Sequence, residues 1–429
     1  MPTWPASVFQ ETAMTLDSLN PGSTTGPGFT LCSVVRVTGP LDTAVLDAAF
    51  DDVVARNDIL RSTVEPDGET WVQRVHPHTG ARLEQVDAAG RGPGELAAAW
   101  AQEPVPVDQP PLARAFVAEL GPDDHLLGLA FHHVHMDPRS TGLAVRELAR
   151  AYEARLAGGR VPPLPVQYGH YTAARARAAA QRPAAERKAW VDSLAGARPM
   201  GFDCDRDRTG IDRPAPVTLH RHVLDAASAG LLERWALRRR TTLLGALLTG
   251  FTLALAERVA NRDLLVMSVF EQRDLPETRT MLGPFLYPAL IRTEVPPGST
   301  WQTLGPAVRD AVVAAYNSTN VPSSEVLAAH PDLLPAIYTQ PGALCAFQYL
   351  PAYGRTLPIA FGAATGVVVE HDRIPGPSAE IGMMFRLRRR DDGDLVARIA
   401  YDARDHSEAS MLALFDDFAA RLSEPLAGV

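Results

Sequence analysis

The chain has few of the residues that hold small or metal-dependent folds together. It contains three cysteines in 429 residues, Cys32, Cys204 and Cys345, which are odd in number and widely spaced. No Cys-x-x-Cys pair and no Cys/His finger spacing occurs, although these patterns are typical of disulfide frameworks and structural zinc sites. We therefore expect neither a disulfide framework nor a structural zinc ion.

Lysine is almost absent, because Lys188 is the single lysine among 41 basic residues. Acidic residues number 50, and the formal net charge is −9 at pH 7. Nonspecific binding to nucleic acid depends on an excess of positive charge. The charge balance therefore predicts no nucleic-acid partner.

Long hydrophobic runs are missing as well. No segment reaches the roughly 18 uninterrupted apolar residues that suffice for a membrane span. The first ten residues contain no basic segment followed by an apolar one, which a secretory signal requires. The sequence thus predicts a cytoplasmic protein without a membrane partner.

The remaining composition is that of a globular protein, with 46% hydrophobic and 21% charged residues. A chain of this length suggests two domains or lobes. Helix and strand patterns alternate in two comparable halves, which predicts an α/β fold. They include a buried strand over 126–131, a helix over 140–156 and a long helix over 171–194 that could bridge the lobes.

The segment His-His-Val-His-Met-Asp at 132–137 joins that strand to the helix that follows it. Strand ends are where open α/β sheets place their chemistry. Histidine is the side chain best suited to proton transfer near neutral pH. The segment is therefore a candidate for a catalytic base, a metal site or a packing feature.

The three interpretations make different demands. A metal site would need His133, His135 and Asp137 on one face of a continuing strand, and no second ligand cluster stands out, so we predict no metal. Packing fits His132, whose ring would bond to the backbone in the core. A base needs one neutral imidazole whose other nitrogen is held by an acceptor, with Asp137 shaping the loop through an arginine. No Gly-x-Ser-x-Gly segment occurs nearby, so we expect direct attack of a bound nucleophile on a bound electrophile.

His132, His133 and Asp137 together resemble the HHxxxDG motif of nonribosomal peptide synthetase condensation domains and related acyltransferases. Further segments resemble that family in the same order along the chain. They are Ser7 to Leu16 for its first motif, Arg56 to Arg61 for RHExLR, Tyr168 to Tyr171 for YxDY, Leu282 to Arg292 for VGxFVNTxxxR, and Asn320 to Pro322 for HQDVPFE.

The resemblance implies two chloramphenicol-acetyltransferase-like lobes in a V with a central tunnel. Residues 1–175 would form the N-terminal lobe with the motif. Residues 176–429 would form the C-terminal lobe with the floor-loop and bridging segments. A carrier protein would present the donor on its phosphopantetheine arm, and the acceptor would enter from the other side. The resemblance implies no bound cofactor and a monomer.

The resemblance also assigns roles within the motif. Its second histidine is the functional one, so His133 would act as a general base for the acceptor or position it. His132 and Pro138 would support the motif. Asp137 would form a structural ion pair with Arg273 or Arg61, and breaking a buried pair of this kind costs about 3–5 kcal/mol.

Departures from the family pattern concern the tunnel. Pro138 replaces the final glycine of the motif, and Tyr287 replaces an asparagine. We predict His135, Gly283, Tyr287 and Met383 as tunnel residues, with core packing or a satisfied polar group as the alternative. The arginines at 386 and 388–390 are expected to form a solvated charge run, or else a surface for a carrier protein.

The sequence predicts a free-standing condensation enzyme of natural-product biosynthesis, such as antibiotic production. It would join a carrier-bound acyl or aminoacyl thioester to an amine or alcohol, giving an amide or ester. Two alternatives are a coenzyme-A-dependent acyltransferase, whose DFGWG signature is missing, and a catalytically silent module that recruits other proteins.

Overall fold

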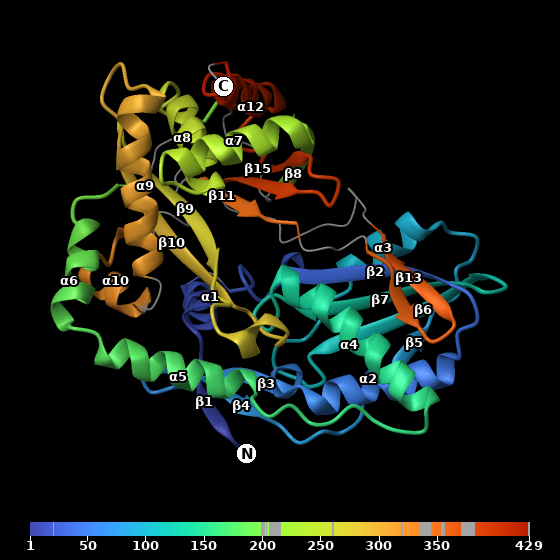
Figure 1. Cartoon of the computed structure of the whole chain (residues 1–429). Helices are drawn as coiled ribbons and strands as arrows, with labels where there is room; N and C mark the ends of the chain where they lie inside the picture. Colours follow the sequence, from blue (N-terminus) through green and yellow to red (C-terminus); the bar gives the residue numbers. More distant parts are fainter. Residues whose placement is uncertain are drawn as a thin grey trace. The chain divides into compact units, whose positions relative to one another are not determined.

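The computed structural model describes residues 1–19, 21–198, 202, 204–205, 216–259, 261–318, 321, 323–333, 336, 345–352, 357–369 and 382–427. The chain forms two compact units. Unit 1 comprises Met1–Gln181, Glu271–Leu286 and Gly354–Ser378. Unit 2 comprises Arg182–Phe270, Tyr287–Tyr353 and Ala379–Val429. The α/β class predicted from the sequence is confirmed (Figure 1).

Unit 1 contains a large and a small sheet. Its elements are β1 (Thr3–Pro5), α1 (Val8–Leu19), β2 (Thr30–Thr38), α2 (Thr43–Arg56), β3 (Ser62–Asp67), β4 (Thr70–Val75), β5 (Leu83–Gln85), α3 (Pro93–Gln102), β6 (Ala113–Gly121), β7 (Asp124–His132), α4 (Pro138–Leu156), α5 (Tyr168–Gln181), β12 (Ile359–Phe361) and β13 (Ala364–Val368). The large sheet has the order β12-β13-β2-β7-β6-β5, and the small one β1-β4-β3.

The alternation of side chains along β7 explains how the large sheet is covered. Leu127 and Leu129 point into a core that α2 and α4 complete. Leu126 and Ala130 point to the other face, where Trp100 of α3 packs. Gly128 lies on that second face, and a side chain there would meet the Trp100 ring at 2.5 Å. Both faces of β7 are therefore buried, so its pairing register is strongly specified.

Unit 2 is built around one mixed sheet. Its elements are α6 (Ala184–Ser193), β8 (Pro216–Leu224), α7 (Ala226–Arg238), α8 (Leu243–Ala256), β9 (Asp263–Glu271), β10 (Leu286–Glu294), α9 (Trp301–Asn317), α10 (Ser323–Ala329), β11 (Cys345–Leu350), β14 (Met383–Arg389), β15 (Leu395–Asp402) and α12 (Glu408–Ser423). The sheet order is β10-β9-β11-β14-β15-β8, and β9 and β10 each extend by one residue into unit 1.

Some expected boundaries differ from the structure. The single helix expected over 171–194 is wrong, because the chain forms α5 and α6 with Pro183 at the start of the second. The helices α3 and α9 were not predicted; Pro306 inside α9 weakens its helical pattern. The expected lobe boundary at residue 175 lies within α5. Residues 271–286 and 354–378, expected in the C-terminal lobe, belong to unit 1.

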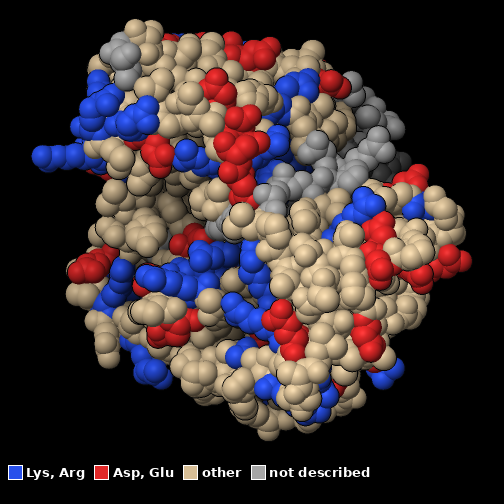
Figure 2. Space-filling model, turned by 45° about the vertical axis from the view of Figure 1, so that its right-hand side comes forward, with Lys and Arg blue, Asp and Glu red and all other residues tan. Residues whose placement is uncertain are grey.

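Arginine supplies nearly all the positive charge, and many arginines are paired with carboxylates. Examples are Arg36 with Asp124 at 2.7 Å and Arg292 with Asp263 at 2.7 Å. Basic and acidic side chains lie close together over much of the face in Figure 2. Within the described residues, none of the helices combines the length and apolar character needed to cross a bilayer.

The solvated charge run expected over the arginines at 386 and 388–390 is wrong. These residues begin on β14, whose alternation sends them to different faces. Arg386 is partly buried against Gln348, and Arg389 pairs with Glu233 at 2.7 Å. Only Arg390 of the four is exposed.

Replacement of Phe251 by alanine should destabilise unit 2. The ring is fully buried and lies 4.7 Å from that of Phe347 and 4.8 Å from that of Phe385. We expect a loss of about 3–5 kcal/mol in the free energy of unfolding, measured with a chemical denaturant. Leu237→Ala on exposed α7 is the control, with an expected change of about 0.5 kcal/mol or less. Equal losses in the two variants would contradict the assigned core.

Candidate active site

The chain turns sharply between β7 and α4. β7 ends at His132, which pairs with Thr30 of β2. Asp137 caps α4, and its Oδ1 accepts a hydrogen bond of 2.6 Å from the main-chain N–H of Ser140. Pro138 is the first helical residue, where a missing N–H leaves no helical hydrogen bond unmade and the fixed φ suits the helix. With proline in place of the glycine of the motif, α4 begins at residue 138, two residues before the start predicted from the sequence.

His133 lies at the first position of this turn. Its main-chain N–H donates to the Phe29 carbonyl at 2.9 Å, and its Nδ1 lies 2.8 Å from the Met136 carbonyl oxygen. A carbonyl can only accept, so Nδ1 carries the proton in the neutral ring and Nε2 holds the lone pair. The side chain is 8% exposed and packs against Phe9, with 5.2 Å between ring centroids. This tautomer is the one that a general base acting through Nε2 requires.

His132 lies in the core. Its Nδ1 accepts a hydrogen bond of 3.2 Å from the Val134 N–H. Burial, with the neighbouring His135 and His133, lowers the pKa of His132 to about 3. The ring is therefore neutral at physiological pH and packs as the sequence predicted.

His135 is completely buried. Burial lowers its pKa to about 4, and the Val107 backbone opposes this shift. Its ring centroid lies 6.5 Å from that of His132. The continuing strand that would place His133, His135 and Asp137 on one face is wrong, because the strand ends at His132.

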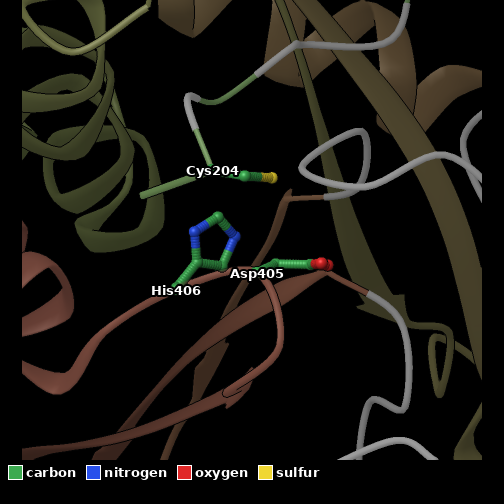
Figure 3. A group of neighbouring side chains, drawn as sticks. All are labelled: Cys204, Asp405 and His406. Carbon is green, nitrogen blue, oxygen red and sulfur yellow. The ribbon is translucent and has the colours of Figure 1, made fainter. Parts of the chain in front are cut away.

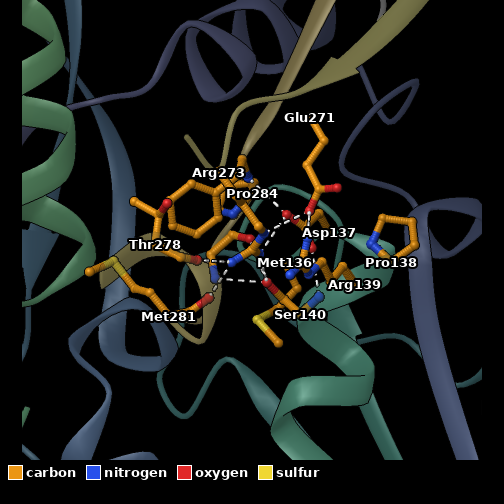
Figure 4. Close-up of polar contacts among 12 residues, drawn as sticks. Met136, Asp137, Pro138, Arg139, Ser140, Glu271, Arg273, Thr278, Met281 and Pro284 are labelled. Atoms are coloured by element: carbon orange, nitrogen blue, oxygen red, sulfur yellow. Dashed lines mark hydrogen bonds and ion pairs between the residues drawn. The ribbon is translucent and has the colours of Figure 1, made fainter. Parts of the chain in front are cut away.

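The Asp137 carboxylate is the best-buried charge of the turn, with 1% exposed. Its Oδ2 accepts from Arg273 Nη2 at 2.9 Å and from the Phe285 N–H at 3.0 Å. Both oxygens thus accept hydrogen bonds from fixed donors. Asp137 is therefore a structural brace, and the ring of Pro138 points away from these contacts (Figure 4).

Arg273 extends the network into the segment 271–286. Its Nη1 donates to the carbonyls of Thr278 at 2.5 Å and Met281 at 2.7 Å, and its Nε lies 2.8 Å from Glu271 Oε1. The guanidinium stacks over the Phe285 ring at 3.9 Å from its centroid. One cation thus holds this segment on the start of α4.

Ser140 and Gly283 form the second link between these segments. Ser140 Oγ donates to the Gly283 carbonyl at 2.8 Å and accepts from Arg273 Nη2 at 2.6 Å. Gly283 has φ of +152°, and a Cβ there would lie 2.3 Å from the Tyr168 ring. Tyr168 donates its hydroxyl to the Pro284 carbonyl at 2.9 Å. Glycine is therefore required at 283 because the backbone and a buried aromatic ring approach closely.

Comparison with known sequences identifies the family. Residues 3–330 match the family described as "Condensation domain", which is more than half of the chain. The chain belongs to the condensation domain family. The resemblance noted in the sequence is thereby confirmed.

Curated relatives of this condensation domain are much longer proteins. Cyclosporin synthetase simA of Tolypocladium inflatum is 29% identical over 69% of the chain, which covers 2% of that relative. Nonribosomal peptide synthetase TES of Alternaria alternata is 25% identical over 73% of the chain and 6% of its own length. Surfactin synthase subunit 1 of Bacillus subtilis (strain 168) is 26% identical over 69% of the chain and 8% of its own length. The chain thus spans under a tenth of each of these relatives.

Solved structures share the fold over nearly the whole condensation domain. SgcC5 from Streptomyces globisporus has a TM-score of 0.82 at 22% identity, over 99% of this chain and 98% of that one. The X-domain from teicoplanin biosynthesis, solved with OxyB, has a TM-score of 0.79 at 24% identity, over 99% and 93%. The first condensation domain of the calcium-dependent antibiotic synthetase has a TM-score of 0.74 at 20% identity, over 99% and 97%. The predicted fold with two chloramphenicol-acetyltransferase-like lobes is confirmed, whereas the V and its tunnel stay predictions.

The structure brings only some of the predicted residues together. Asp137 contacts Arg273, whereas Arg61 contacts Asp58 at 2.6 Å, so the alternative pairing with Arg61 is wrong. Tyr287 and Met383 are buried in β10 and β14. Together with His135 and Gly283, they are tunnel residues only as a prediction. Asn320 and Pro322 lie outside the described residues, and Val321 between them is buried.

Sequence reasoning missed the roles of Ser140, Glu271 and Phe285. Ser140 contacts Gly283 across 143 positions of the chain. A local signal existed only for the cap, since Asp137 precedes Ser140 by three residues. The contacts to the segment 271–286 have no local sequence signature.

A second cluster of potential ligands lies in unit 2. Cys204, Asp405 and His406 each offer one atom, and these atoms lie within 4.8 Å of one another (Figure 3). Sulfur, oxygen and imidazole nitrogen are all zinc ligands. Asp205 anchors this loop, because its Oδ1 accepts from the Ser407 N–H at 2.8 Å. Among the described residues, this is the one group of His, Cys, Asp and Glu side chains close enough to share a metal ion.

Replacement of Asp137 by asparagine should destabilise unit 1, because Arg273 loses its fully buried carboxylate partner and keeps only the partly exposed Glu271. We expect a loss of about 3–5 kcal/mol in the free energy of unfolding. Asp274→Asn is a control in the same segment. Its carboxylate pairs with Arg175 but is 49% exposed, so the expected loss is about 1 kcal/mol or less. Similar denaturation midpoints for Asp137→Asn and the unchanged protein would show that Asp137 is not a structural brace.

The buried histidines should make stability depend on pH. The folded pKa of His135, about 4, is below the unfolded value of about 6.5, so the unfolded chain binds more protons in this window. Stability is fully present above about pH 6.5 and is lost as the pH falls toward 4. We expect His135→Leu to reduce this slope by up to about 1.4 kcal/mol per pH unit.

Denaturant unfolding between pH 4 and 7 measures this slope. His222→Gln serves as a control, because the His222 side chain is 56% exposed. The control should keep the slope of the unchanged protein. If His135→Leu also keeps it, the assigned burial of a neutral His135 is wrong.

Proposed function

We propose that this condensation domain joins a carrier-protein-tethered acyl or aminoacyl thioester to an amine or alcohol, giving an amide or ester in natural-product biosynthesis. The observation that carries the proposal is the hydrogen bond from His133 Nδ1 to the Met136 carbonyl. It leaves the lone pair on Nε2, where an acceptor proton can be taken. Family membership supports the chemistry, since condensation domains act on carrier-bound thioesters.

The reaction balances without a bound cofactor. The acceptor nitrogen or oxygen attacks the thioester carbonyl, and His133 Nε2 receives the proton. The new C–N or C–O bond forms, the C–S bond breaks, and the proton passes to the departing phosphopantetheine thiol. Base catalysis of this kind contributes roughly 10²–10⁴-fold, and positioning of the two substrates adds to it.

Residues around His133 support this step without taking the proton. His132 is neutral at physiological pH, so its ring adds no positive charge beside His133. The carboxylate of Asp137 is held by Arg273 and fixes the start of α4. In the proposal, this domain receives the carrier protein and the acceptor as separate partners and acts as a monomer in the cytoplasm.

A second candidate is recruitment of another protein without catalysis. It is favoured by one observation: the similar X-domain from teicoplanin biosynthesis was solved in complex with OxyB. A module that only recruits another protein would not need a proton acceptor at His133 Nε2. The two candidates therefore differ in their response to substitution of His133.

His133→Ala should lower product formation by roughly 10²–10⁴-fold while the chain stays folded, as shown by a cooperative unfolding transition above the assay temperature. The assay offers loaded carrier proteins, acyl-coenzyme A donors and small amines or alcohols to the full chain, and detects products by mass spectrometry. His78→Ala, a partly exposed histidine of unit 1, should keep full turnover.

The outcomes separate the candidates. Equal turnover of His133→Ala and the unchanged chain would eliminate the role of His133. Turnover with acyl-coenzyme A but with no carrier protein would favour the coenzyme-A-dependent alternative. Absence of any product, together with unaltered binding of an oxygenase by both variants, would favour recruitment.

A further inference from the structure

The sheet of unit 2 has one face that its long helices cover. On β14, Met383, Phe385 and Leu387 are fully buried. The Phe385 ring lies 4.8 Å from Phe251 of α8, which in turn contacts Phe418 of α12 at 5.8 Å. Since side chains alternate along a strand, Met384, Arg386 and Arg388 belong to the opposite face.

Two arginines lie side by side on this opposite face. In the antiparallel pairing of β14 with β15, Arg386 is directly opposite Arg398. The same row continues to His220 on β8 and to Gln348 on β11. Directly opposed residues on one face of a sheet have Cβ atoms about 4.5–5.5 Å apart. The two guanidinium groups therefore belong to one local surface.

These arginines differ from the many paired arginines of the chain. Arg386 donates from Nε to Gln348 Oε1 at 3.0 Å and from Nη2 to Met384 Sδ at 3.2 Å. In the part of the chain that the structure describes, no carboxylate contacts Arg386 or Arg398. Arg389 lies on the helix-covered face of β14, and Glu233 neutralises its charge there.

Partial burial makes it unfavourable to keep the Arg386 and Arg398 charges side by side. Burial and the Arg398 charge lower the pKa of Arg386 to about 9, and burial also lowers the pKa of Arg398. Guanidinium groups keep their proton in proteins at neutral pH, so both side chains stay cationic. Like charges directly opposite each other destabilise a sheet, and partly desolvated cations gain most from an anionic partner. The missing partner is therefore expected to come from outside the described residues.

The surface around the two arginines is partly open. At the other end of the same face, α6 and α10 cover β9, where Leu265 packs with Val191 and Val326. Arg386 and Arg398 are both partly exposed, and His220 beside them is exposed. A small molecule can therefore reach them.

We propose that Arg386 and Arg398 bind an oxyanion, the carboxylate or phosphate group of a small molecule. Guanidinium groups present planar pairs of donors that match both groups, and two adjacent ones can hold a single oxyanion from two sides. Gln348 accepts a hydrogen bond from Arg386 Nε and so orients the guanidinium group. The remaining N–H groups of Arg386 are then directed along the row. Oxyanion binding itself is independent of the proposed condensation; identifying the oxyanion as part of the donor arm or of the acceptor rests on that function.

Calorimetric titration of the full chain with two matched pairs of probes tests the site. 4′-Phosphopantetheine is compared with pantetheine, and phenylalanine with phenylalaninamide, so that each pair differs in the anionic group. In at least one pair, the anionic probe should bind the unchanged chain more tightly. Arg386→Gln and Arg398→Gln should each weaken that binding roughly tenfold or more, as expected for a lost charge-assisted hydrogen bond.

Arg389→Gln is the matched control, because it removes a neighbouring arginine that Glu233 already neutralises. It should leave the affinity unchanged. A preference for 4′-phosphopantetheine identifies a phosphate site, and a preference for phenylalanine a carboxylate site. Equal affinities within both pairs, or equal losses in all three variants, would overturn the proposal. Because binding is measured without turnover, an inactive chain that still binds the anionic probe would overturn only the proposed function.

Discussion

The buried ion pair between Asp137 and Arg273 is the constraint on which the candidate site depends. Removing both charges from water is costly, and the cost is offset only when every polar atom finds a partner. Here the carboxylate also caps α4 and accepts from the Phe285 N–H, while the guanidinium binds two carbonyls. The pair therefore ties a helix start to a distant segment of chain.

That attachment determines the geometry of the His133 turn. β7 fixes one end of the turn through its ladder with β2, and the capped start of α4 fixes the other. Between them, the Met136 carbonyl is placed 2.8 Å from His133 Nδ1. The tautomer of the ring is thus a consequence of backbone position, which in turn depends on the ion pair.

The three histidines show how burial divides one residue type into different roles. His132 and His135 are sealed in the core, and desolvation favours their neutral forms. His133 is 8% exposed, and the Met136 carbonyl places its proton on Nδ1. In unit 2, by contrast, Arg386 and Arg398 keep their charges side by side, which is why an external oxyanion is the expected partner there.

The sequence by itself determined the α/β class, the strand and helix on either side of the turn, and the need of Asp137 for an arginine. These follow from hydrophobic periodicity and from the cost of a buried charge, which are local or general properties. Only the tertiary structure decided that Arg273 is this partner and Arg61 is not, that residues 271–286 belong to unit 1, and that Arg386 faces Arg398. Contacts such as Ser140 with Gly283, 143 positions apart, depend on how distant segments pack, and no local pattern records them.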